Sequence, residues 1–317
     1  PDQHPPGPAG RELLMGRILG FLALAVLVTA CSSAPPAPEG VQDRKNRAAD
    51  YLKFGQNAFR EAQWDQALAF YLNAVDLDTA VDHVPGMAAA WNSVASAQTA
   101  LGRTDEARAA LAQAEALATE SGDRTLVLQV AVNLVQADLA AGALDAARKR
   151  LDSLAPFPAT AEGAALDHAR GTLEKALDHP DLALAAFDRA LGVNQKLGLK
   201  SEMASNHFMK ASVLGRQAKW AEAKAELQTA LALDKTMENT LGIGQDWRSL
   251  GTVALKLGDA QGAFDAYVRA ERLFQAAGLA DQQRKTLELL LPVTVTLGAT
   301  TEQARYQAIL DRLTPAK

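Results

Sequence analysis

The sequence predicts an all-helical solenoid in which antiparallel helix pairs stack side by side. Hydrophobic residues make up 48% of the chain and aromatic residues only 5%. A composition rich in Ala and Leu and poor in aromatics favours packed helices over sheets. The second observation is a repeat of about 40 residues, which is the signature of stacked helical units. An alanine, a bulky residue four positions later and a small or apolar residue three positions after that recur six times, at Ala67/Tyr71/Ala74, Ala107/Leu111/Ala114, Ala147/Leu151/Leu154, Ala183/Phe187/Ala190, Ala223/Leu227/Ala230 and Ala263/Tyr267/Ala270.

The amino-terminal region precedes these repeats and has the features of a leader. Met15 is a better start than Pro1, so residues 1–14 are interpreted as an upstream extension. Residues 18–30 form an uncharged apolar run behind Arg17. This run is shorter than the roughly 20 residues that a transmembrane helix needs. It suits the apolar region of a signal peptide, which we place at residues 15–30.

The leader ends in a motif around Cys31, the single cysteine of the chain. Val28-Thr29-Ala30-Cys31 resembles the lipobox of bacterial lipoproteins. The resemblance implies cleavage before Cys31 and lipidation of its sulfur, which palmitate labelling would detect. By the same resemblance to bacterial lipoproteins, Ser32 after the cysteine, rather than Asp, implies sorting to the outer membrane, with the mature protein facing the periplasm. The alternative is an ordinary secretory signal with a cysteine at that place by chance.

A polar, Pro-rich segment follows the cysteine and contains Ala34-Pro35-Pro36-Ala37-Pro38. Such a segment cannot bury enough apolar surface to fold. We therefore expect residues 31–47 to form a flexible tether. Extended, its fifteen residues after Ser32 would reach at most about 50 Å from the membrane.

Each repeat between residues 48 and 275 is predicted to be a pair of helices. In the sixth, Trp247, Leu250 and Ala254 share one helix face. Gly258 is a natural left-handed stop for that helix, and Asp259 can cap the next one. Gly251 and Ala263, where the two helices cross, allow their backbones to approach closely.

These residues resemble the tetratricopeptide (TPR) signature W-x₂-L-G-x₂-Y…A-x₃-F. The resemblance covers residues 48–275 and implies a right-handed superhelix whose inner face binds a protein segment. The sequence departs from the pattern in its longer period and in repeat four, where Asp167 and Arg170 replace bulky residues. Another helical-hairpin solenoid therefore stays open as an alternative.

Two irregular regions interrupt this pattern. One repeat step is only 36 residues long, and it coincides with Pro156 and Pro158. Because proline cannot continue a helix, we expect a bend at residues 155–160 that divides the solenoid into two groups of three repeats. Residues 276–317 are expected to form capping helices or a degenerate seventh repeat.

The sequence contains little that could support catalysis. Its five histidines lack the H-E-x-x-H spacing of a zinc site, and phosphate-binding and nucleophile motifs are absent. We therefore expect no enzyme activity, no metal and no cofactor. Asp76, Asp78, Asp82 and His83 are interpreted as a solvated helix end. The net charge is −5, and the sequence contains no stripe of basic residues. Both observations argue against nucleic acid as a partner.

The remaining hypothesis is a membrane-anchored scaffold that binds other envelope proteins and assists their assembly or localisation. The alternative is an accessory regulator of a cell-wall enzyme or transporter. The oligomeric state is left open. In the TPR resemblance, the partner-binding residues on the concave face would be Gln56, Phe59, Asn92, Ser96, Asn133, Gln136, His168, Phe208 and Arg248.

Overall fold

The computed structural model describes residues 40–313, and every regular element in this range is an α-helix. The all-α prediction is therefore confirmed. The helices are α2 (Val41–Arg60), α3 (Trp64–Thr79), α4 (Val84–Ala100), α5 (Thr104–Ser121), α6 (Arg124–Ala140), α7 (Leu144–Leu154), α8 (Ala161–Ala176), α9 (Pro180–Leu197), α10 (Lys200–Arg216), α11 (Trp220–Thr236), α12 (Thr240–Lys256), α13 (Ala260–Ala276), α14 (Ala280–Thr296) and α15 (Thr300–Leu313).

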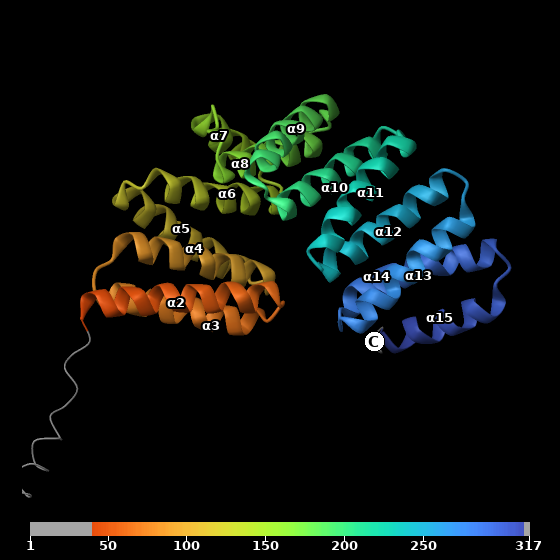
Figure 1. The fold of residues 1–317 in the computed structure, drawn as a ribbon, viewed down its shortest axis with the longest axis horizontal. Helices are drawn as coiled ribbons and strands as arrows, with labels where there is room; N and C mark the ends of the chain where they lie inside the picture. The colour runs from red at the N-terminus through yellow and green to blue at the C-terminus, as the bar shows by residue number, and fades with distance from the viewer. Residues whose placement is uncertain (1–39, 314–317) are drawn as a thin grey trace, which may run out of the picture.

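Consecutive helices pair into seven hairpins, from α2/α3 to α14/α15, which follow one another along an open arc (Figure 1). We call the first helix of each hairpin the A helix and the second the B helix. Successive A helices also contact each other, as α2 does with α4, α4 with α6, and α8 with α10. The A helices therefore lie on the inner side of the curve. The predicted tail forms a seventh hairpin, whose helix α14 continues through Pro292.

The turns between helices share one geometry, which explains the regular register. A residue in the left-handed region stands every 20 residues, from Ala62 to Gly142 and again from Asp178 to Gly298. At Gly258, its own N–H bonds to the carbonyl of Leu255, and the next N–H bonds to that of Ala254. The Asp259 side chain then accepts a hydrogen bond from the backbone N–H of Gly262 at 2.7 Å. The predicted stop and cap are thus confirmed.

Five of these left-handed positions lack glycine, and Ala218 with φ +58° is one of them. An L-residue with a Cβ is strained there, whereas glycine is not. Ala218→Gly should therefore raise the free energy of unfolding by about 1 kcal/mol, measured by urea denaturation. Ala225→Gly, at an exposed position inside α11, is the matched control and should lower it by about 1 kcal/mol. A loss of stability in Ala218→Gly would contradict the proposed strain.

Inside the first, fourth and sixth hairpins, an aromatic ring of the B helix packs against a glycine of the A helix. A Cβ added to Gly171 would lie 2.6 Å from Cε1 of Phe187, and one added to Gly251 would lie 2.7 Å from Tyr267. Both rings are fully buried. Repeat four therefore keeps its core contact although it departs from the sequence signature.

Three expectations need correction or limits. The helix break at residues 155–160 is confirmed, because α7 ends at Leu154 and α8 begins at Ala161; the division into two groups stays a prediction. The tether boundary at residue 47 is wrong, since α2 already begins at Val41. Asp78 is not solvated: it is buried and lies 2.7 Å from Nδ1 of His83.

The leader lies outside the described residues. This holds for the proposed extension, the signal peptide, the lipidation site Cys31 and the first part of the tether. Within residues 40–313, none of the helices combines the length and the hydropathy that crossing a membrane requires.

Candidate functional site

The nine predicted contact residues all lie on A helices, and several of them join neighbouring repeats. Nδ2 of Asn133 on α6 donates to Oδ1 of Asn92 on α4 at 2.7 Å and lies 3.3 Å from Oγ of Ser96. Arg248 on α12 donates to Oε1 of Gln282 on α14 at 2.7 Å. The structure thus brings these side chains to one surface, the inner face formed by the A helices.

His168 on α8 belongs to the same surface but is not a free side chain. Its Nδ1 lies 2.8 Å from Oδ1 of the buried Asn206 on α10, and its ring meets Phe187 edge-on with a centroid distance of 5.3 Å. Burial lowers the pKa of His168, and the charge of Lys175 lowers it further against the opposing hydrogen bond from Asn206. A neutral imidazole that donates to Asn206 fits this geometry.

The other predicted residues differ in how accessible they are. Gln56 and Gln136 are exposed, so their amides are available to a partner. Phe59 and Phe208 are half-buried and pack against hydrophobic core clusters. The Arg248 guanidinium lies over the Phe274 ring at 5.5 Å. The inner face therefore combines accessible amides with aromatic rings and an arginine whose positions are fixed by contacts within the protein.

A polar pocket on this face was not predicted. It lies between α10 and α12, has a volume of about 170 Å³, and has Asp234 and Asp246 among its lining residues. Burial first, and then the neighbouring Asp234 carboxylate, raise the pKa of Asp246 to about 8. Burial also raises the pKa of Asp234, against hydrogen bonds from Asn239 and Asp246. The pair therefore shares a proton at neutral pH.

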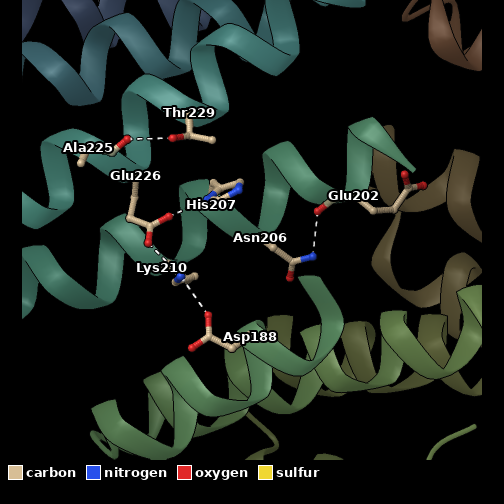
Figure 2. Close-up of polar contacts among 8 residues, drawn as sticks. All are labelled: Asp188, Glu202, Asn206, His207, Lys210, Ala225, Glu226 and Thr229. Atoms are coloured by element: carbon tan, nitrogen blue, oxygen red, sulfur yellow. Dashed lines mark hydrogen bonds and ion pairs between the residues drawn. The ribbon is translucent and has the colours of Figure 1, made fainter. Parts of the chain in front are cut away.

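On the outer side, a charged network joins three helices (Figure 2). Lys210 of α10 bridges Asp188 of α9 at 2.9 Å and Glu226 of α11 at 2.8 Å, and His207 also contacts Glu226. Burial alone would raise the pKa of Glu226, but hydrogen bonds from His207 and Lys210 and their charges outweigh it, so the net shift is downward. All four side chains are satisfied by one another, so the network serves packing.

A second cavity, of about 410 Å³, lies where α7 ends early. Its charged residues are paired: Arg189 contacts Asp167 at 2.7 Å, and Arg170 contacts Asp152 at 2.6 Å. The Arg170 guanidinium also lies 5.9 Å from the centre of the Phe157 ring. The departures in repeat four are therefore explained by these ion pairs beside the proline-containing loop.

No protein-family model matches the sequence, and a comparison with curated proteins finds no match. Solved structures do match. The apo form of the quorum sensor NprR from B. thuringiensis has a TM-score of 0.64 at 15% identity, covering 96% of this chain and 84% of that one. A Rap protein complexed with Competence and Sporulation Factor has a TM-score of 0.63 at 15% identity, covering 84% and 74%.

The Rap conjugation gene regulator of plasmid pLS20, in complex with the Phr* peptide, has a TM-score of 0.59 at 14% identity, covering 78% of this chain and 67% of that one. At these identities the likeness shows the fold alone. The chain is a TPR-like helical solenoid, as its repeats predicted.

Proposed function

We propose that this chain is a scaffold that binds a polypeptide segment along the inner face of its A helices. The observation that carries the proposal is that face itself, where side chains of successive A helices meet, as at Asn92–Asn133 and His168–Asn206. Accessible amides such as Gln136 can hydrogen-bond to the backbone of a partner. Two proteins with a similar fold are described in complex with Competence and Sporulation Factor and with the Phr* peptide, which supports the same use of this fold.

We further propose that the scaffold is anchored by lipid on Cys31 to the outer membrane, faces the periplasm and assists envelope proteins in their assembly or localisation. The support is the lipobox-like motif Val28-Thr29-Ala30-Cys31 and Ser32 after it. Several acyl chains anchor a protein stably, whereas one is marginal. Metabolic labelling with palmitate should be lost in Cys31→Ala. Persistent labelling would show that the lipid is attached elsewhere.

The binding face can be tested by photo-crosslinking in intact cells. A photoreactive amino acid is placed at Gln56 or Gln136 on the inner face, and at the exposed Gln228 of the B helix α11 as the matched control. Crosslinked species identified by mass spectrometry should appear at the two inner positions and not at Gln228. Equal crosslinking at all three positions, or crosslinking at Gln228 alone, would contradict the proposed face.

A further inference from the structure

The pocket between α10 and α12 is part of the inner face. Ser205 and Phe208 line it from α10, and Leu241 and Gln245 line it from α12. Gln245 is three residues before Arg248, so both lie on the same side of their helix. The pocket is therefore open to anything that binds along the A helices. Its inner part is formed by two acidic residues, Asp234 and Asp246.

Within residues 40–313, the Asp246 side chain is paired only with the neighbouring Asp234 carboxyl group, which is itself acidic. Asp246 is only 1% exposed. Its Oδ2 receives no hydrogen bond from any donor in residues 40–313. Asp234 is better satisfied, because Nδ2 of Asn239 donates to its Oδ1 at 3.0 Å. The groups that shift the two pKa values are burial, the other carboxyl group and Asn239, and none of these is positively charged. An uncompensated buried carboxyl pair is costly unless something offsets it.

The corresponding residues of another repeat show whether packing requires the two acids. Asp78 stands 156 residues before Asp234, at the same position of its hairpin, as the step lengths of 40, 40, 36 and 40 require. There the buried acid is paired with His83, and the position that corresponds to Asp246 is the fully buried Ala90. The fold is thus built at this junction with alanine in place of the second acid. Asp246 is an addition that packing does not require.

From this geometry we infer that the pocket binds the side-chain ammonium group of a lysine in the partner polypeptide, beside Asp246 and Asp234. The pocket volume of about 170 Å³ equals that of roughly six waters, which suits the five heavy atoms of a lysine side chain. The stem would pack against Phe208 and Leu241, while the Ser205 hydroxyl and the carboxyl pair accept its hydrogen bonds. A compact ammonium with three donors matches acceptors on several sides. This inference deepens the proposed function, because it names one contact of the proposed binding face.

The test follows the side-chain amide signals of Asn239 and Gln245, which both line the pocket, by NMR on the full chain. The probe is Nα-acetyl-lysine N-methylamide, and its Nε-acetylated form is the uncharged control. The lysine probe should shift both signals saturably, whereas the acetylated form should not. In Asp246→Asn the affinity should fall at least about tenfold, as expected for the loss of a charged hydrogen-bond partner. Asp78→Asn, at the position of another repeat that corresponds to Asp234, should bind like the wild type.

Three results would overturn the inference: equal affinity of the acetylated probe, undiminished binding in Asp246→Asn, or tighter binding of Ca²⁺ or of the corresponding arginine probe. Because Asn keeps the shape of a protonated Asp, retained folding of Asp246→Asn can be checked by its backbone spectrum. If crosslinking confirms the inner face while the lysine probe does not bind, only this inference fails. If the lysine probe binds while inner-face crosslinking fails, the pocket stands without the proposed scaffold function.

Discussion

Asp246→Asn should raise the free energy of unfolding by about 4 kcal/mol at pH 7, and the gain should shrink as the pH falls. Burial first, and the neighbouring Asp234 second, raise the pKa of Asp246 to about 8 in the folded chain. In the unfolded chain the group titrates near 4. Between these pH values the folded state keeps a proton that the unfolded state releases. The stability of the wild type therefore falls as the pH rises through this window, and the amide removes that loss.

Urea denaturation of the wild type and of Asp246→Asn at pH 5 and pH 8 measures this effect. The difference in free energy of unfolding between the two proteins should be about 1.5 kcal/mol at pH 5 and several kcal/mol at pH 8. It should grow by about 1.4 kcal/mol for each pH unit. The exposed Asp265, mutated to Asn, is the control and should behave like the wild type at both values. A difference that does not vary with pH, or a less stable Asp246→Asn at pH 8, would refute the assigned ionisation.

The helix pairs could be predicted because each repeat contains its own information. Tyr267 and Gly251 are only 16 residues apart and make the same contact as Phe187 and Gly171 in another repeat. The turns follow a local rule. A left-handed residue follows every helix from α2 to α14 except α7, and seven of these residues are glycines. A contact that recurs at fixed spacing can be recognised without knowing how repeats stack.

The pocket could not be predicted in the same way, because it depends on how two repeats meet. Asp234 and Asp246 lie on different helices, and nothing local distinguishes them from exposed acids. A signal did exist. Aligned by the repeat, Asp246 falls at the position of Ala90, Val130, Leu166 and Asn206, which are all buried and uncharged. The interpretation of His83 and its acidic neighbours as a solvated helix end was wrong for a related reason. A cluster of acidic residues usually indicates exposure to solvent, whereas Asp78 is buried and paired with His83.

Phe187→Ala should lower the free energy of unfolding by about 4 kcal/mol, the largest loss we expect from a single truncation here. The ring is fully buried, packs on Gly171 within its hairpin and contacts His168 edge-on. In a solenoid each repeat is held only by its neighbours, so a weakened fourth hairpin should also uncouple the two ends. Urea denaturation should show a broader or split transition. Leu182→Ala on the same helix is the control, because Leu182 is 58% exposed and should cost less than about 0.5 kcal/mol.

A second substitution shows whether the loss comes from the glycine–ring contact itself. Gly171→Ala places a Cβ within 2.6 Å of the Phe187 ring and should cost about 1–3 kcal/mol by overpacking. In the Phe187→Ala background the ring is gone, so the added methyl group should cost little or even fill part of the cavity. The two effects should therefore be non-additive by at least about 1 kcal/mol in a double-mutant cycle. Strict additivity would mean that the ring and the glycine stabilise the hairpin independently, and the close packing of repeat four would then need another explanation.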